Sequence, residues 1–140
     1  MNEEVELIRT FIIARKRDRL VELLSSSKRR SKGTTALAHF RDLDSRYIVQ
    51  IPNSEQDPRS IERMLRSRGA GDSCYLVSED PALDAQRLSL SEALNRIVGK
   101  GMGTLLSCVP GKLAYFEGEG PSDRYILLGA FIVDTPQAAV

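Results

Sequence analysis

The chain has 140 residues, of which 41% are hydrophobic and 28% are charged, and its formal net charge is +1. These values are typical of a single globular domain, and they exclude a strong overall attraction to nucleic acid or anionic lipid. The charge is uneven along the chain, because residues 1–41 carry ten basic and five acidic side chains, whereas residues 42–80 carry five basic and eight acidic ones. The first third of the chain is therefore basic and the middle is acidic.

Composition also bears on the cellular compartment. No run of about eighteen apolar residues is present, so the sequence predicts no membrane-spanning segment, and the acidic N-terminus lacks the positive charge of a secretory signal. We expect a cytoplasmic protein. Cys74 and Cys108 each lie in an apolar run, where a reduced thiol packs like a small hydrophobic residue. A disulfide between neighbouring strands is the alternative.

The first predicted element is a long helix over residues 3–24, a segment that contains no Gly or Pro and is rich in Glu, Leu, Arg and Ile. Its apolar residues do not form a single stripe. We therefore expect the helix to contact its own core and a second surface, such as another copy of the chain. Residues 25–33 are predicted to be a solvated loop, and residues 34–40 a short second helix.

Strands and helices alternate from residue 46 onward. Runs of β-branched and aromatic residues predict five strands, over residues 46–52, 73–78, 104–110, 113–118 and 124–133. Asp57 followed by Pro58 predicts the start of one helix, and Gly69 is placed to end it. Ser89, with Glu92 three residues later, forms a capping box at the start of another helix.

This order of elements predicts one α+β domain over residues 1–140, with a helical, basic part at 1–41 and an α/β core at 46–134. The core is predicted to be a mixed five-stranded sheet with the element order β-α-β-α-β-β-β. Its first half would contain parallel pairings and its second half an antiparallel meander. Right-handed crossovers place both core helices on one face, and we expect the N-terminal helices to cover another face or an edge.

The segment from Val98 to Thr104, VGKGMGT, is the most motif-like string in the chain. Phosphate-binding loops run from a strand through glycines into a helix, whose N-terminal N–H groups hold the anion. Here the order is reversed, because the glycines follow a predicted helix and precede a strand. The segment therefore predicts a helix-terminating turn, and an anion-binding nest of consecutive N–H groups is the alternative.

Three arginines on the helix that starts at Asp57 form the clearest electrostatic feature. Arg59, Arg63 and Arg66 lie on one side of that helix, at positions i, i+4 and i+7. This arginine row could bind carboxylate or phosphate groups through its guanidinium forks. The alternative is a solvated helix face that Glu55 and Glu62 partly neutralise.

A second concentration of positive charge lies in the segments RKRDR, residues 15–19, and KRRSK, residues 28–32. We name Arg15, Lys16 and Arg19 the N-terminal basic cluster and take these three residues as candidates for binding an anion. Aromatic residues are not interleaved with the basic ones, so contact with phosphates without recognition of bases is the most that these segments predict for nucleic acid. Solubilising surface is the alternative.

His39 is the only histidine, three residues from Asp42 and five from Asp44. This spacing allows a His–carboxylate pair or part of a metal site, as a small hydrolase would need. A histidine at a helix end, hydrogen-bonded to a nearby aspartate, is the alternative.

Two acidic loops complete the candidate sites. Glu79, Asp80 and Asp84 follow the second predicted strand, and Glu117 and Glu119 follow the fourth. If the fold brings the two loops together, their carboxylates could surround a divalent cation or a basic partner. Turn formation and solubility explain both loops as well.

We recognise no reactive constellation and no cofactor-binding motif in this sequence, and we expect neither a cofactor nor a metal ion. The first hypothesis is a non-enzymatic binding or regulatory domain that engages an acidic protein or another anionic partner through the N-terminal basic cluster and the arginine row. Self-association through the N-terminal helix is a further expectation. The alternatives are a small hydrolase or nuclease-like enzyme built on His39 and nearby carboxylates, and a factor that binds the phosphate backbone of nucleic acid.

Overall fold

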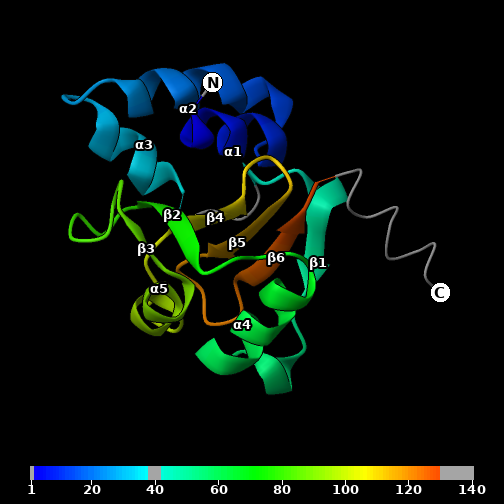
Figure 1. The fold of residues 1–140 in the computed structure, drawn as a ribbon. Coiled ribbons are helices and arrows are strands. Elements are labelled where there is room, and N and C mark those ends of the chain that lie inside the picture. Colours follow the sequence, from blue (N-terminus) through cyan, green and yellow to red (C-terminus); the bar gives the residue numbers. More distant parts are fainter. Residues whose placement is uncertain (1, 38–41, 130–140) are drawn as a thin grey trace.

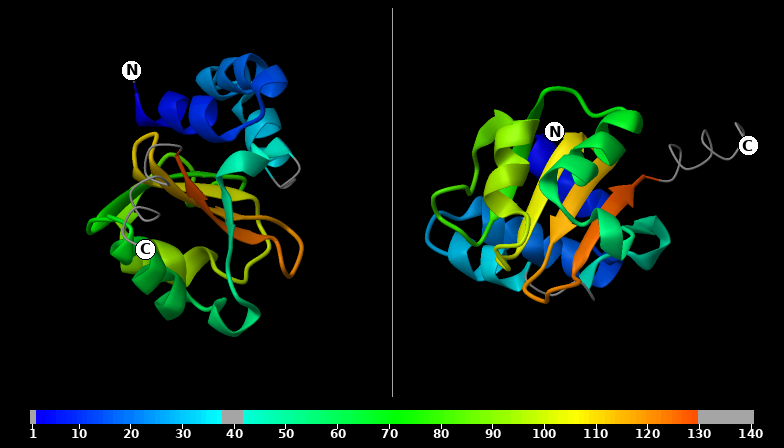
Figure 2. Two further views of the ribbon diagram at one scale, coloured as in Figure 1. Left: turned by 90° about the vertical axis from the view of Figure 1, so that its right-hand side faces the viewer. Right: turned by 90° about the horizontal axis from the view of Figure 1, so that it is seen from below.

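A six-stranded antiparallel sheet between two layers of helices forms the part of the protein that the structure describes, residues 2–37 and 42–129 (Figure 1). In this computed structural model, one face of the sheet is covered by α1 (Glu3–Phe11), α2 (Ala14–Ser25) and α3 (Arg30–Ala36). The other face is covered by α4 (Pro58–Ser67) and α5 (Leu90–Ile97). Figure 2 shows the two helical layers on opposite sides of the sheet. The predictions of an α+β fold and of α4 and α5 on one shared face are confirmed.

The sheet itself differs from the prediction. Its strands are β1 (Ile48–Gln50), β2 (Ser73–Ser78), β3 (Arg87–Ser89), β4 (Thr104–Val109), β5 (Leu113–Glu117) and β6 (Arg124–Leu128). They lie in the order β1-β6-β5-β4-β2-β3, and every neighbouring pair is antiparallel. The prediction of a mixed sheet with five strands is therefore wrong in strand number, pairing and order. Two short 3-10 turns, η2 (Ser45–Tyr47) and η3 (Asn53–Glu55), flank β1.

The physical reason for this difference is the position of the meander β4-β5-β6. It inserts between β1 and β2, which run in the same direction but are never neighbours. The three-residue strand β3 was not predicted. It forms a hairpin with β2 and reverses the direction of the chain before α5. The strand that follows α5, β4, is therefore antiparallel to β2. The two helical crossovers of the prediction exist, but α4 connects β1 and β2, which three strands separate, and α5 connects β3 and β4, which β2 separates.

The predicted long N-terminal helix is also wrong, because the chain breaks between α1 and α2. Ile12 and Ile13 have extended backbones, and their segment pairs with residues 42–44. The N–H of Ile13 donates to the carbonyl of Asp42 at 2.8 Å, and the N–H of Asp44 donates to the carbonyl of Phe11 at 2.7 Å. Each short helix then buries its own apolar side against the sheet. The spread of apolar positions is thus satisfied within one chain, and self-association remains a prediction.

Residues 25–33 do not form a simple loop, since α3 begins at Arg30 and continues the helical layer. Gly33 makes this possible, because a Cβ at this position would lie 2.8 Å from Cδ2 of Leu24. The small residue lets α3 approach α2 closely. The predicted second helix over 34–40 is therefore displaced toward the N-terminus, and its residues 38–40 lie outside the described part of the chain.

Local capping signals agree with the structure on the other face. The Asp57 side chain accepts a hydrogen bond of 2.8 Å from the N–H of Ser60 at the start of α4. Ser89 does the same for the N–H of Glu92 at the start of α5, at 3.2 Å. Apolar side chains of both helices form one core with the sheet face below them.

Candidate anion-binding site

An apolar pocket lies between α2, the end of α3 and the sheet. Its volume is about 310 Å³, at the lower end of the range usual for small-molecule sites. Leu105 of β4 and Phe116 of β5 line it on the sheet side, and Leu20 and Leu23 line it from α2. The remaining apolar lining consists of Ile12, Ala36, Leu37 and Leu43. The pocket therefore brings together side chains from five separate segments of the chain, residues 12–23, 36–37, 42–43, 105 and 116.

The N-terminal basic cluster borders this pocket. Arg15, Lys16 and Arg19 are exposed to solvent and all three line the pocket, together with the carboxylate of Asp42. The helical repeat explains this placement, because residues 16 and 20, like 15 and 19, are four positions apart and share a side of α2. Cationic heads at the solvent border and leucine side chains farther in form one continuous surface. Over the residues that the structure describes, the border carries three positive charges and one negative charge.

The three cations differ in how far they are already paired. Nζ of Lys16 lies 2.9 Å from Oδ1 of Asp42, and Nη1 of Arg19 lies 3.1 Å from Oε1 of Glu22. Arg15 has neither a hydrogen bond nor an ion pair with any other residue in 2–37 or 42–129. Both pairs involve cations about half exposed or more, where ion pairs contribute little and exchange readily. An incoming anion would therefore find Arg15 available and the other two only weakly held.

The start of α2 breaks two rules of helix formation. Its N-cap is Ile13, whose side chain makes no capping bond, and its first turn contains no acidic residue. Instead it carries Arg15, Lys16 and Arg17, which add positive charge where the helix dipole is already positive. Arg17 is engaged with the carbonyl of Ile12 at 2.7 Å and with Asp44 at 3.7 Å. Local sequence rules are commonly broken where function requires it.

The arginine row lies on α4, in the opposite helical layer, so the two basic groups do not form one surface. Arg66 is paired with Glu62 at 2.9 Å and with Asp72 at 2.8 Å. Arg63 donates to Oγ of Ser60 at 3.2 Å. Arg59 borders a polar hollow between α4 and α5. Glu62, whose pKa is held below its usual range by Ser91 and Arg66, partly neutralises this face.

Of the three residues predicted for a hydrolase, the structure describes Asp42 and Asp44. His39 lies outside the described residues. Asp42 is paired with Lys16, and Asp44 with Arg46 at 2.7 Å. The Arg46 hydrogen bonds keep the pKa of Asp44 below its usual range. Both carboxylates thus serve the junction between the N-terminal helices and β1.

Carboxylates of the two acidic loops accept hydrogen bonds from backbone N–H groups of the chain. Oδ1 of Asp80 accepts from the N–H of Ala82 at 3.0 Å, and Oε1 of Glu79 accepts from the N–H of Gly103. Asp84 binds Arg30 and the N–H of Ser78, and Glu119 is exposed. Over residues 2–37 and 42–129, no group of three or more His, Cys, Asp and Glu side chains is placed to hold a metal ion.

The glycine segment after α5 binds an anion that belongs to the chain. Gly99 and Gly101 have positive φ angles of 85° and 72°, as a helix-terminating turn requires. Their N–H groups donate to Oε2 of Glu117, at 3.0 and 3.5 Å. Glu117 is completely buried and also accepts from Arg124 and from the hydroxyl of Tyr115. The segment is therefore a helix-terminating turn and also a nest of N–H groups, and the anion that this nest holds is the carboxylate of Glu117.

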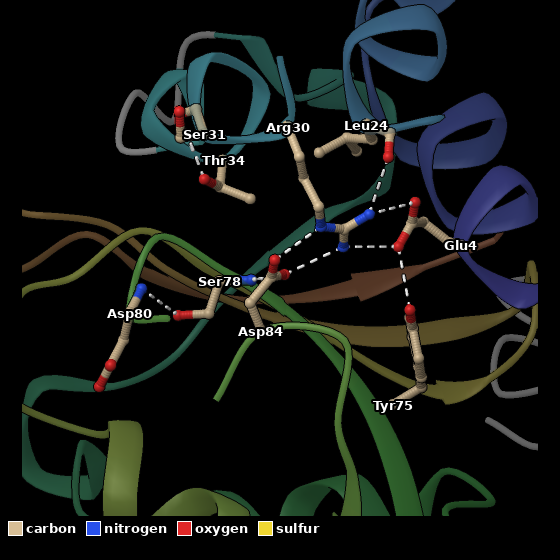
Figure 3. A network of polar contacts seen from close by, with 9 residues as sticks. All are labelled: Glu4, Leu24, Arg30, Ser31, Thr34, Tyr75, Ser78, Asp80 and Asp84. Carbon is tan, nitrogen blue, oxygen red and sulfur yellow. Dashed lines mark hydrogen bonds and ion pairs between the residues drawn. The ribbon is translucent and has the colours of Figure 1, made fainter. Parts of the chain in front are cut away.

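The second basic segment, residues 28–32, is partly committed to structure. All five N–H groups of the Arg30 guanidinium donate hydrogen bonds, to Glu4, to Asp84 and to the carbonyl of Leu24, at 2.6 to 3.0 Å (Figure 3). The hydrogen bonds that Arg30 donates to Asp84, and then those to Glu4, raise the pKa of Arg30 above its usual value. Tyr75 also donates to Glu4 at 3.0 Å. Arg30 therefore joins α1 and α3 to the loop after β2 and is not available to a partner.

Sequence reasoning found the cations of the pocket but missed its apolar lining. The spacing of Lys16, Leu20 and Leu23 along α2 was the available signal, since it places a cation and two leucines on one side of a helix. The contributions of Leu105 and Phe116 follow from strand register, which a single sequence does not reveal.

Comparison of the chain with protein-family models, curated proteins and solved structures finds no match in any of the three. Within the residues that the structure describes, none of the helices has the length and apolar character needed to cross a bilayer. Function must therefore be inferred from the geometry of this chain.

Proposed function

We propose that this protein is a small binding or regulatory domain that engages an anionic partner through the N-terminal basic cluster. The observation that carries the proposal is the gathering of Arg15, Lys16 and Arg19 on one side of α2, at the border of an apolar pocket. Guanidinium and ammonium groups are the usual ligands of carboxylate and phosphate in proteins. A binding role needs no further reactive group.

Electrostatics of the helix start support the same conclusion. Arg15 and Lys16 lie in the first turn of α2, which contains no acidic residue and no side-chain cap. Their charges and the positive end of the helix dipole both favour an anion nearby. An anionic partner would relieve a repulsion that the folded chain leaves only partly compensated by Asp42 and Glu22.

The arginine row remains the second candidate surface, and one experiment compares it with the first. The affinity for a heparin oligosaccharide is measured at several salt concentrations, because each released counterion adds to the salt dependence. We expect Arg15→Gln/Arg19→Gln to lower affinity and to reduce the slope of log K against log salt by about 1.5 to 2. Arg59→Gln/Arg63→Gln should reduce this slope less, because the acidic side chains of Glu62 and Asp72 lie beside the arginine row.

A matched control removes the same charge elsewhere. Arg96 and Lys100 are exposed on α5 and the turn after it, outside both basic groups, so Arg96→Gln/Lys100→Gln should retain most of the wild-type slope. Equal losses in all three double variants would show that only net charge matters and would overturn the proposal. A wild-type protein without salt-dependent affinity would overturn it as well.

A further inference from the structure

The pocket beside the N-terminal basic cluster has the two-part chemistry of a site for an amphiphile. Among the lining residues that the structure describes, eight are apolar and four are charged, namely Arg15, Lys16, Arg19 and Asp42. The accessible apolar surface comes mainly from Leu20 and Leu23, each 7% exposed, and from the half-buried Ala36, whereas Leu105 and Phe116 are only 0% and 1% exposed. An apolar chain that packs here leaves water for an apolar surface.

The volume of the pocket limits what it can hold. A volume of about 310 Å³ admits about ten groups of the size of a water molecule or a methylene, at roughly 30 Å³ each. Because the pocket opens to solvent, this volume sets an upper limit of about ten carbons for one aliphatic chain. A folded polypeptide segment or a two-chain lipid would not fit within it.

The border of the pocket specifies the other end of the ligand. Arg15 is unpaired within the described part of the chain and its guanidinium can bind a carboxylate or phosphate through two parallel hydrogen bonds. Lys16 and Arg19 are exposed, and their pairs with Asp42 and Glu22 are weak competitors. The net positive border complements a negative head group and opposes a positive one.

We infer that the pocket between α2 and the β4–β5 part of the sheet binds a free, single-chain amphiphile with an anionic head group, such as a medium-chain carboxylate. The aliphatic chain lies against Leu20, Leu23 and Ala36, and the head group lies at Arg15. This inference rests on the proposed function, because it names the chemical class of the anionic partner.

The wild-type protein with a series of ligands gives the first test. Binding of hexanoate, octanoate, decanoate and tetradecanoate is measured by isothermal titration calorimetry. Burial of one methylene is worth about 0.8 kcal/mol, so affinity should rise up to about four-fold per methylene. The rise should stop near ten carbons, where the pocket is full. Octan-1-ol, which has no charge, should bind at least ten-fold more weakly than octanoate. A flat chain-length series or equal binding of octanoate and octan-1-ol overturns the inference.

Two variants separate the pocket from the charge. Ala36 is half-buried and lines the pocket from the end of α3, so Ala36→Trp should block the chain and reduce decanoate affinity at least ten-fold. Ala82→Trp introduces the same side chain at an exposed site in the loop after β2 and should leave that affinity unchanged. Arg15→Gln should weaken decanoate more than octan-1-ol. Circular dichroism confirms that each variant is folded, and the wild-type ligand series remains decisive if one is not.

The outcomes also distinguish this inference from the proposed function. If heparin affinity depends on Arg15 and Arg19 but no carboxylate binds, the inference fails and the proposed function stands. If neither ligand binds, both fail. Binding to vesicles of phosphatidylglycerol without binding of decanoate would assign the cluster to a membrane surface and overturn the inference. A dimer that decanoate does not dissociate would assign the pocket to a second copy of the chain, with the same consequence.

Discussion

The N–H of Gly99 lies 3.0 Å from Oε2 of Glu117 and donates a hydrogen bond to it, although Glu117 is eighteen residues away in the sequence and completely buried. Arg124 donates to the same carboxylate at 3.2 and 3.3 Å, and its own side chain is only 14% exposed. This buried pair connects the turn after α5 to β5 and β6. The glycine segment therefore has a structural role in the fold.

Glu117→Gln should destabilise the protein strongly. The substitution removes the charge that compensates Arg124 and leaves a nearly buried guanidinium without its partner, at a cost of about 3 to 5 kcal/mol in the free energy of unfolding. Urea denaturation measures this loss. Arg124→Met alone should also destabilise, and the double variant should lose less than the sum of the two, because they share one interaction. Strict additivity would show that the pair does not interact.

Arg30→Lys should loosen the N-terminal layer although it keeps the charge. A lysine ammonium cannot reproduce the five directed N–H bonds to Glu4, Asp84 and the carbonyl of Leu24. We expect a loss of about 2 to 3 kcal/mol in the free energy of unfolding. Amide hydrogen exchange should accelerate most in α1 and α3. Arg29→Lys is the control, because the ion pair of Arg29 with Glu22 is 4.0 Å long and exposed. This variant should change neither the free energy of unfolding nor the exchange rates of α1 and α3. Uniform acceleration over the whole chain would contradict this role.

Asp57 should make stability depend on pH in the acid range. Hydrogen bonds from the backbone N–H and then the hydroxyl of Ser60 lower its pKa below the ordinary value. A lowered pKa in the folded state means that Asp57 stabilises the protein above its unfolded pKa of about 3.9 and that this stabilisation is lost as pH falls through the folded value. The stability difference between wild type and Asp57→Ala should therefore be constant from about pH 7 to 5 and shrink below about pH 4.

Asp57→Asn serves as the control for this pH dependence, since asparagine keeps a capping oxygen without the titratable proton. Its stability relative to wild type should increase as the pH falls. Urea denaturation at a series of pH values measures both differences. A gap between wild type and Asp57→Ala that persists unchanged at pH 2 would contradict the assigned cap.

Cys74 should react slowly with thiol reagents in the folded protein. It is fully buried, and burial raises its pKa to about 12. At pH 8 only about one thiol in ten thousand would be ionised, and the thiolate is the reactive form. In a Cys108→Ser variant, labelling by 5,5′-dithiobis(2-nitrobenzoate) should be at least a hundred-fold slower in buffer than in urea. Equal rates in both solutions would place Cys74 at the surface.

The parts of the fold that sequence reasoning predicted are those that local rules determine. Asp57 and Ser89 cap α4 and α5 as expected, because the capping bonds join residues three positions apart. The break at Ile12 and Ile13 could not be predicted, since no Gly or Pro marks it and long-range pairing with residues 42–44 causes it. Strand order escaped prediction for the same reason, because it depends on contacts between distant segments.

The same distinction between local and long-range contacts applies to the candidate site. Charge along α2 was visible in the sequence, so Arg15, Lys16 and Arg19 were found. The sequence did not show that Arg30 is fully paired whereas Arg15 is not paired within the described part of the chain. The carboxylates that bind Arg30 belong to Glu4 and Asp84, which are 26 and 54 residues away. Composition identifies where charge is concentrated, and only tertiary structure decides which charges remain available to a partner.

A titration of uniformly ¹⁵N-labelled protein with decanoate, followed by ¹H–¹⁵N correlation spectra, tests the site most directly. We predict saturable shifts in the amides of α2, together with Leu43, Leu105 and Phe116, while the amides of α4 stay in place. Shifts centred on α4 and the arginine row, or no saturable shift at all, would contradict a binding site for an anionic amphiphile at the N-terminal basic cluster.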